Sequence, residues 1–290
     1  MPDRIVGPDS LPPLREVIAR YDIGARRSLG QHFLLDLNLT RRIARDAGPL
    51  DGLTIIEIGP GPGGLTRALL ESGAREIIAI ERDARAVEAL AMLRNAYPGR
   101  LTIIEDDALG VSLSSLGDSE TPKAVVANLP YNIAQRLLVS WLHEIDAVQS
   151  LTLMFQKEVA DRLVAPPGSR TYGRLSVITQ WLCEVEPLFD VPPSAFVPPP
   201  KVTSTVVHFT PRARSLAPAG FATLERVTAS AFGQRRKMLR AALKTLSKDP
   251  LALLEEAAID PTARAETLTV EQFCSLARAY DAATADQYPS

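Results

Sequence analysis

Cysteine and histidine are scarce in this chain. Its 290 residues include two cysteines, Cys183 and Cys274, and three histidines that stand far apart. A disulfide framework or a Cys- or His-rich metal site is not expected, because each needs several such residues at short spacing. Low cysteine content is typical of proteins kept in a reducing compartment, so we expect a cytoplasmic protein without a metal ion.

Long apolar runs are missing as well. No stretch approaches the roughly 18 consecutive apolar residues of a membrane span, and the N-terminal residues lack the apolar core of a signal peptide. We therefore expect no association with a membrane. Hydrophobic residues make up 46% and charged residues 23% of the sequence, which is the balance of an ordinary globular protein.

The overall charge is weak, but its distribution is uneven. The formal net charge is −2, which by itself indicates no partner of either sign. Between residues 212 and 248, however, nine basic residues stand against the single acid Glu225, a local charge of +8. Such an excess can bind phosphate groups, whereas the simpler interpretation is a solvated helix face.

Short apolar runs alternate with amphipathic stretches in the first half of the chain. Helices are predicted at residues 11–20, 38–47, 64–70, 84–95 and 133–143. Strands are predicted at residues 53–58, 76–80, 101–105, 124–127 and 151–155. Strands that alternate with helices predict a parallel sheet that is covered on both faces.

The pattern changes after residue 155. Helices are predicted at 156–164 and 174–182, and a late strand at 202–209. The proline-rich stretch 191–200 cannot be regular helix, because proline lacks the backbone donor and clashes with the preceding turn. Beyond Pro211 the chain reads as short helices. We therefore predict an N-terminal extension at 1–24, a sheet domain at 25–211 and a small helical domain at 212–290.

A glycine-rich loop, Gly-Pro-Gly-Pro-Gly-Gly at residues 59–64, joins the first strand of the sheet to a helix. Glycines let the backbone approach a ligand at the carboxyl end of the sheet. Glu81 ends the second predicted strand and can accept hydrogen bonds from ribose hydroxyls. Asp107 follows the third predicted strand and can accept a hydrogen bond from the adenine amine. A dinucleotide and S-adenosylmethionine both fit these features. The spacing departs from the dinucleotide fingerprint G-x-G-x-x-G and favours S-adenosylmethionine over a dinucleotide or a plain turn.

The motif Asn-Leu-Pro-Tyr at residues 128–131 follows the fourth strand. An amine conjugated to adenine is a poor nucleophile, because its lone pair is delocalised into the ring. The Asn128 side-chain carbonyl and the backbone carbonyl of Leu129 or Pro130 can accept its two N–H groups, and Tyr131 can stack on the base. A turn of this composition is common in proteins when it stands alone. In a chain that also has the glycine loop, and at the end of the fourth strand, it indicates methylation of an amine on a base.

With these motifs in place, the sequence resembles the small-subunit ribosomal RNA adenine dimethyltransferase family. The resemblance spans nearly the whole chain, at residues 28–36, 59–64, 81, 107, 128–134, 155–159, 172–173, 195–207 and 232–239. It implies a Rossmann-like class I methyltransferase sheet with a small C-terminal helical domain that binds rRNA. It also implies a monomer that uses S-adenosyl-L-methionine, without a metal, to dimethylate two adjacent adenosines. These lie in the 3′-terminal hairpin of 16S rRNA, in the 30S subunit or its precursor, which links the activity to ribosome biogenesis.

The same resemblance implies roles for individual residues. The cofactor contacts are His32, Leu34, Gly59, Gly61, Glu81, Asp107 and Asn128. The catalytic pocket comprises Asn128, Pro130, Tyr131 and Phe196, with Phe196 as the wall opposite Tyr131. The rRNA contacts are Arg235, Arg236, Lys237 and Arg240, in a segment predicted to open a helix. The position of His32 is often Asn in this family, so it is open whether His32 contacts the cofactor by its side chain or its backbone.

Three other functions are alternatives to this one. Enzymes that methylate an adenosine of large-subunit rRNA share the cofactor motifs, but residues 196–207 and 235–239 favour the small-subunit family. A non-catalytic checkpoint role in subunit assembly is compatible with the same sequence. A nicotinamide-dependent reductase is disfavoured by the missing phosphate fingerprint.

Overall fold

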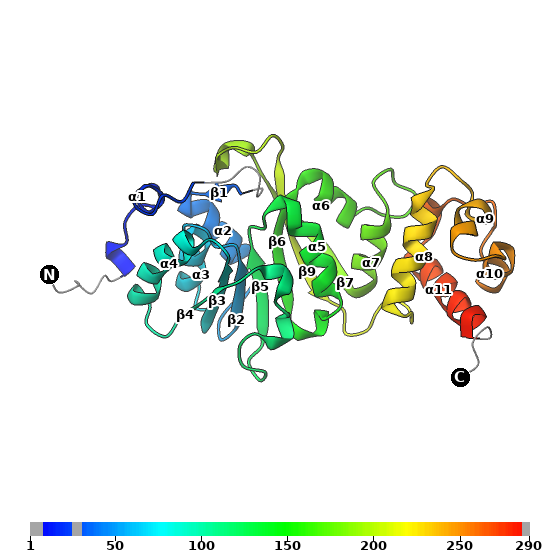
Figure 1. The fold of residues 1–290 in the computed structure, drawn as a ribbon, viewed down its shortest axis with the longest axis horizontal. Coiled ribbons are helices and arrows are strands. Elements are labelled where there is room, and N and C mark those ends of the chain that lie inside the picture. Colours follow the sequence, from blue (N-terminus) through cyan, green and yellow to red (C-terminus); the bar gives the residue numbers. More distant parts are fainter. Residues whose placement is uncertain (1–7, 25–30, 286–290) are drawn as a thin grey trace. The chain divides into compact units, whose positions relative to one another are not determined.

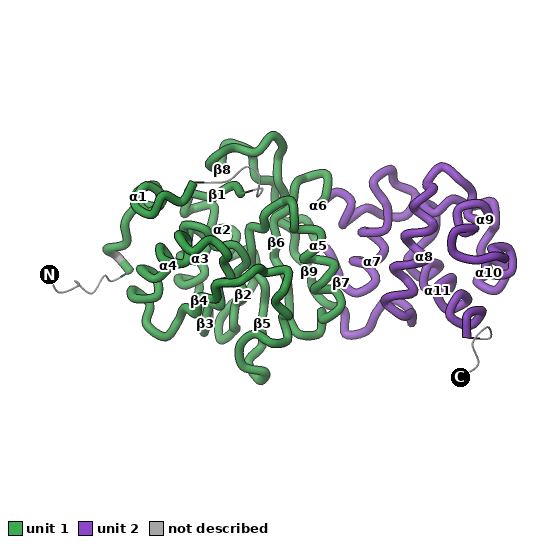
Figure 2. Tube along the Cα trace, in the orientation of Figure 1, with its two compact units in different colours: residues 1–160, 186–211 green, residues 161–185, 212–290 purple. Residues whose placement is uncertain are grey.

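The computed structural model describes residues 8–24 and 31–285, and the chain divides into two compact units (Figure 2). Unit 1 comprises residues 1–160 and 186–211, and unit 2 comprises residues 161–185 and 212–290. The helical unit therefore includes residues 161–185, which the sequence placed with the sheet. Residues 1–7 of the predicted N-terminal extension lie outside the described residues, as do residues 28–30 and 286–290.

Unit 1 is built on a seven-stranded sheet with the order β4-β3-β2-β5-β6-β9-β7 (Figure 1). The strands are β2 (Thr54–Ile58), β3 (Glu76–Glu81), β4 (Leu101–Glu105), β5 (Lys123–Ala127), β6 (Ser150–Gln156), β7 (Cys183–Val191) and β9 (Ser204–Pro211). The first five strands in this order are parallel, whereas β9 pairs antiparallel with β6. The sheet is thus mixed rather than purely parallel, since β9 turns back after β7 without the crossover helix that parallel pairing needs.

Strand β7 was not predicted from the sequence. It alternates acidic and apolar residues and contains Pro187 near its middle. Proline cannot donate to a neighbouring strand, so it is tolerated on a sheet edge, which is where β7 lies. The division between the two units falls within this strand.

Helices cover the sheet of unit 1. They are α1 (Leu14–Arg20), α2 (Leu37–Asp46), α3 (Gly64–Glu71), α4 (Ala84–Ala96), α5 (Tyr131–Leu142) and the start of α6 (Lys157–Leu163), after a short 3-10 turn at Pro8–Ser10. The carboxylates of Asp36 and Asp83 accept backbone N–H groups at the starts of α2 and α4, the usual way to begin a helix. Every residue of β2 and β5 is buried. Because strand side chains alternate between faces, both faces of the sheet are covered there, as expected.

A two-stranded sheet joins distant segments beside the glycine loop. β1 (Phe33–Leu34) pairs antiparallel with β8 (Phe196–Val197), with Phe33 opposite Val197 and Leu34 opposite Phe196. A 3-10 turn, Pro193–Ala195, precedes β8, so the proline-rich stretch contains no α-helix, as predicted. This pairing fixes residues 31–34 close to the carboxyl ends of the parallel strands.

Unit 2 is helical with a hydrophobic core of its own. Besides the end of α6, its helices are α7 (Arg174–Leu182), α8 (Phe221–Gly233), α9 (Leu239–Ala242), α10 (Pro250–Glu256) and α11 (Val270–Ala285). Trp181, Leu224 and Phe273 are among the buried residues of that core. Across the described parts of both units, no helix is long and apolar enough to cross a membrane.

Candidate active site

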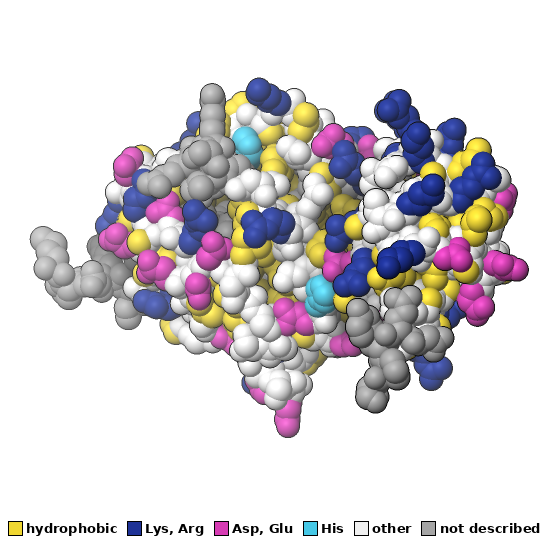
Figure 3. Space-filling view, turned by 45° about the vertical axis from the view of Figure 1, so that its right-hand side comes forward, with side chains coloured by type: hydrophobic (Ala, Val, Ile, Leu, Met, Phe, Trp, Pro, Cys, Tyr) yellow, Lys and Arg dark blue, Asp and Glu magenta, His cyan; other side chains and the backbone are white. Residues whose placement is uncertain are grey.

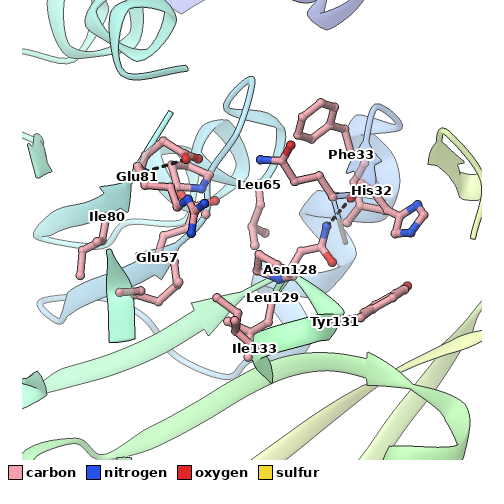
Figure 4. A pocket seen from close by; sticks show the side chains of 18 of the residues that line it. His32, Phe33, Glu57, Leu65, Ile80, Glu81, Asn128, Leu129, Tyr131 and Ile133 are labelled. Carbon is pink, nitrogen blue, oxygen red and sulfur yellow. Dashed lines mark hydrogen bonds between the residues drawn. The ribbon is translucent and has the colours of Figure 1, made fainter. Parts of the chain in front are cut away.

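A pocket of about 960 Å³, including its open mouth, lies at the carboxyl ends of β2, β3 and β5 (Figure 4). The structure brings most of the predicted site residues together in its lining. These are His32, Leu34, Gly59, Glu81, Asp107, Asn128, Pro130 and Tyr131. Among the described residues, the lining does not include the predicted residues Gly61 and Phe196. The carboxyl ends of parallel strands are where open α/β sheets bind ligands.

The glycine loop bends tightly against β1. Gly61 has φ of +53°, in the left-handed region where other residues are strained. A β-carbon at this position would lie 2.8 Å from the Phe33 ring. The loop can therefore pass close to the pocket and to β1 only because this residue has no side chain.

Glu81 is held rigidly at the end of β3. Its side chain is 4% exposed, and its carboxylate accepts backbone N–H groups of Gly61, Arg82 and Asp83 at 2.8 to 3.1 Å. Burial raises the pKa of Glu81, while the three backbone N–H groups act in the opposite direction. The carboxylate thus ties the glycine loop to β3 and keeps lone pairs at the pocket surface for a ligand with hydroxyl donors.

Asp107 lies beyond β4 and is about half exposed. Its carboxylate accepts the Leu109 N–H at 3.0 Å and lies 3.6 Å from an Arg82 guanidinium nitrogen. These contacts orient the side chain at the pocket rim, and its contact with an adenine amine stays a prediction.

The amide of Asn128 is oriented by the backbone of His32. The Asn128 Nδ2 donates to the His32 carbonyl at 3.0 Å, drawn as a dashed line in Figure 4. A carbonyl can only accept, so the amide nitrogen must face His32. No hydrogen bond to the Asn128 Oδ1 occurs within the described residues, and this oxygen is left as an acceptor.

The segment that follows Asn128 supplies a second acceptor. Leu129 is 1% exposed, and Pro130 caps α5. The Pro130 carbonyl accepts the N–H groups of Ile133 and Ala134 at 3.1 Å. No such backbone bond to the Leu129 carbonyl occurs in the described part of the chain. The sequence allowed either the Leu129 or the Pro130 carbonyl as the second acceptor. The Leu129 carbonyl is therefore the better candidate, because the Pro130 carbonyl already accepts hydrogen bonds from α5.

Aromatic rings gather at the same corner. The Tyr131 hydroxyl bonds with the Ser204 hydroxyl on β9, and burial raises the pKa of Tyr131. The His32 ring lies 5.2 Å from that of Tyr131 and 6.3 Å from that of Phe196, between centroids. The His32 Nδ1 lies 2.8 Å from the Pro198 carbonyl. Since that carbonyl only accepts, Nδ1 carries the hydrogen and, in the neutral ring, Nε2 is an acceptor.

Phe196 is less accessible than the sequence suggested. It is 2% exposed and belongs to the hydrophobic core that also contains Leu34 and Met154. It lies behind two residues of the pocket lining, the His32 ring and its strand partner Leu34. The direct stacking of Phe196 on a base stays a prediction, and in the described conformation its packing role is evident.

Glu57 opens the sequence motif that indicates a cofactor, residues 57–64, but the sequence predicted no role for it. It lines the pocket near the end of β2 and is 1% exposed. Burial raises the pKa of Glu57 to about 8; the Thr66 hydroxyl opposes this rise, and the nearby charge of Glu81 adds to it. The available signal was an acid in an otherwise apolar strand immediately before the glycine loop.

The predicted rRNA contacts lie in unit 2: Arg235, Arg236 and Lys237 stand between α8 and α9, and Arg240 lies in the first turn of α9. Residues 234–237 form a turn, and α9 begins at Leu239. Arg236, Lys237 and Arg240 are exposed, while the partly buried Arg235 pairs with Glu266 at 3.2 Å. Lys and Arg side chains gather on the face of unit 2 seen in Figure 3.

Known proteins resemble this chain in sequence and in fold. The ribosomal RNA adenine dimethylase family matches residues 23–282. A ribosomal RNA small subunit methyltransferase A of Rhodospirillum rubrum is 64% identical over 275 residues, covering 95% of this chain and 94% of the relative. That of Paramagnetospirillum magneticum is 64% identical over 282 residues, covering 97% and 99%.

Solved structures agree with the sequence relatives. A dimethyladenosine transferase from Plasmodium falciparum is 26% identical with a TM-score of 0.74, over 87% of this chain and 98% of that one. The 23S rRNA methyltransferase ErmE is 26% identical with a TM-score of 0.64, over 86% and 99%. These matches also establish the class I methyltransferase sheet predicted from the sequence. The chain belongs to the ribosomal RNA adenine dimethylase family.

Proposed function

We propose that this protein transfers methyl groups from S-adenosyl-L-methionine to N6 of two adjacent adenosines near the 3′ end of 16S rRNA. It acts as a cytoplasmic monomer on the 30S subunit or its precursor, without a metal ion. Two relatives that are 64% identical over nearly their whole length carry a small-subunit methyltransferase name, which favours this substrate over large-subunit rRNA.

The observation that carries the proposal is the acceptor pair at Asn128 and Leu129. The Asn128 Nδ2 donates to the His32 carbonyl, which leaves the Asn128 Oδ1 as an acceptor. The N–H groups of α5 donate to the Pro130 carbonyl, which leaves the Leu129 carbonyl as a second acceptor. An amine with two N–H groups can donate to both remaining oxygens. These bonds localise the lone pair on nitrogen and oppose its delocalisation into the ring.

The pocket residues also fit the cofactor. The buried Glu81 carboxylate suits two ribose hydroxyls, and Gly61 lets the glycine loop pass close to Phe33 of the pocket lining, where a β-carbon would collide with the ring. His32, Leu34, Gly59 and Asp107 would complete the contacts. When bound, S-adenosylmethionine would supply a methyl group on a sulfonium. The amine nitrogen would bond to that carbon as the carbon–sulfur bond breaks to leave a thioether, and the methylated amine would release its proton to water.

The chain's own residues accelerate this reaction by alignment and by charge. Orienting two reactants can contribute about 7–11 kcal/mol in favourable cases. The oxygens of Asn128 and Leu129 stabilise positive charge that grows on the amine nitrogen. Tyr131, tethered to Ser204, presents a ring on which the base can stack.

Unit 2 would hold the RNA. Arg236, Lys237 and Arg240 are exposed and can contact phosphates, which releases counterions and favours binding. Arg235 would support this turn, because it is engaged with Glu266. This separate basic surface also favours a second role, in which the protein binds an assembling small subunit as a checkpoint factor without needing to methylate it.

The test is methyl transfer from labelled cofactor to undermethylated 30S particles, followed by mapping of the modified bases. We expect label on two adjacent adenosines near the 3′ end of 16S rRNA. Label at other positions of 16S rRNA, or label only on large-subunit rRNA offered in a parallel reaction, would refute the substrate assignment. An Asn128→Ala variant that binds particles without methylating them would separate catalysis from a checkpoint role.

A further inference from the structure

Two buried carboxyl groups line the pocket, and they differ in their partners. The oxygens of Glu81 accept three backbone N–H groups. Glu57 is 1% exposed, and its Oε2 is buried without a hydrogen-bond partner among the described residues. A charged carboxylate is unfavourable where one of its buried oxygens has no partner. Because Glu57 lacks the hydrogen bonds that Glu81 has, we infer that a ligand in the pocket interacts with the Glu57 carboxyl group.

The position of Glu57 indicates what that partner is. Strand β2 lies between β3, which ends at Glu81, and β5, which leads to Asn128. Glu57 is paired in register with Ala79 of β3, two residues before Glu81. A cofactor with its ribose at Glu81 and its methyl group facing Asn128 must cross the end of β2. The sulfonium end of such a ligand therefore passes over the strand that carries Glu57.

We propose that Glu57 is a proton-linked subsite for the sulfonium charge: its carboxyl group is neutral in the free protein and ionises when a cationic ligand fills the pocket. This inference rests on the proposed use of S-adenosylmethionine. It implies that the protein distinguishes that cation from the neutral product S-adenosylhomocysteine by charge. The proton that Glu57 loses on binding passes to the solvent.

The electrostatics of the pocket support this coupling. Burial raises the pKa of Glu57 to about 8, so the group holds a proton at neutral pH in the unliganded protein. The negative charge of Glu81 also raises the pKa of Glu57. A sulfonium nearby has the opposite effect and favours the ionised form. The other titratable residues that line the pocket are His32, Arg82, Asp106, Asp107 and Tyr131.

The two ligands form a matched pair for testing this idea. S-adenosylmethionine and S-adenosylhomocysteine share the adenosine, the amino group and the carboxylate, and differ by one methyl group and one positive charge. Titrations that respond to the shared groups cancel in the ratio of the two affinities. If Glu57 ionises only with the cation, this ratio rises with pH by up to about tenfold per unit below pH 8.

The experiment is calorimetry of both ligands, from pH 6 to pH 9, in buffers with different ionisation enthalpies. For the wild type near pH 7 we expect a proton to be released with S-adenosylmethionine and none with S-adenosylhomocysteine. Glu57→Gln keeps the size and polarity of the side chain but cannot ionise, so its affinity ratio should not change with pH. Glu105→Gln, which removes an exposed carboxylate from β4, on the far side of β3 from Glu57, is the control and should behave as the wild type does.

Equal proton release with both ligands in the wild type would overturn the inference, whether or not the variant folds. Proton release that persists in a folded Glu57→Gln protein would also overturn it, and would assign the effect to another group such as Glu81. If neither ligand binds to the wild type, the proposed cofactor itself is wrong. The two failures are therefore distinguishable.

Discussion

Replacing Glu57 by Gln should make the stability of unit 1 less dependent on pH. The pKa of Glu57 is raised from its ordinary value of 4.5 to about 8 in the folded chain. Below the lower value, the group is protonated whether the chain is folded or not. As pH rises towards the higher value, the unfolded chain loses this proton first, and the folded state is progressively destabilised.

The size of the effect follows from the interval between the two pKa values. Each pH unit within it changes the free energy of unfolding by about 1.4 kcal/mol. Between pH 4.5 and pH 8 the contribution of Glu57 therefore falls by at most about 5 kcal/mol. A Gln side chain does not titrate, so the variant should gain stability relative to the wild type across this interval and level off above it.

The assay is urea unfolding of both proteins at several pH values from 5 to 9. The chain contains two tryptophans. Trp141 is buried on α5 of unit 1, and Trp181 lies in the core of unit 2. A Trp181→Phe background therefore leaves one fluorophore that reports on unit 1. A stability difference between the wild type and the Glu57→Gln variant that stays constant from pH 5 to pH 8 would refute the reasoning. The same loss of pH dependence in the Glu105→Gln control would refute it as well.

Three further outcomes are expected. Glu81→Ala should weaken S-adenosylmethionine binding by a few kcal/mol, at about 1.5–3 for each lost bond to a charged group; unchanged affinity in calorimetry would contradict its ribose contact. Gly61→Ala should reduce cofactor affinity and lower the melting temperature, because the added carbon meets an aromatic ring at a strained φ; a variant with wild-type values would exclude this crowding. Reversing Arg236, Lys237 and Arg240 to Glu should abolish binding to 30S particles but not to cofactor; normal particle binding at several salt concentrations would mean that the basic turn is only a solvated surface.

The elements around the pocket could be predicted because local rules specify them. Strand β4 has the predicted bounds, and β2, β3, β5 and β6 differ from theirs by one residue at one or both ends. Apolar runs of this length, separated by a glycine loop or by amphipathic helices, have few other solutions. Glu81 and Asn128 follow from the same rules, because each stands at the carboxyl end of a parallel strand or just beyond it.

Other features depend on contacts between distant segments. The position of β9 between β6 and β7, and that of β7 on the sheet edge, depend on which strands pair, and the local sequence pattern does not specify this. Pro187 also argued against a strand at β7, because proline is rare inside strands. Residues 161–185 join the helical unit because Tyr172 and Trp181 pack into its core. Such packing depends on the partner surface rather than on the helix period.

In the site, the sequence by itself determined which chemical groups are present, and the tertiary structure decided which of them are free to act. The residues of the 128–131 motif supply several possible acceptors, but only the folded chain shows that the His32 carbonyl orients the Asn128 amide and that α5 engages the Pro130 carbonyl. Likewise, only burial makes Glu57 differ from an ordinary acid and places Phe196 in the core. Hydrogen-bond partners and solvent access are properties of the assembled fold, so no spacing along the chain could have specified them.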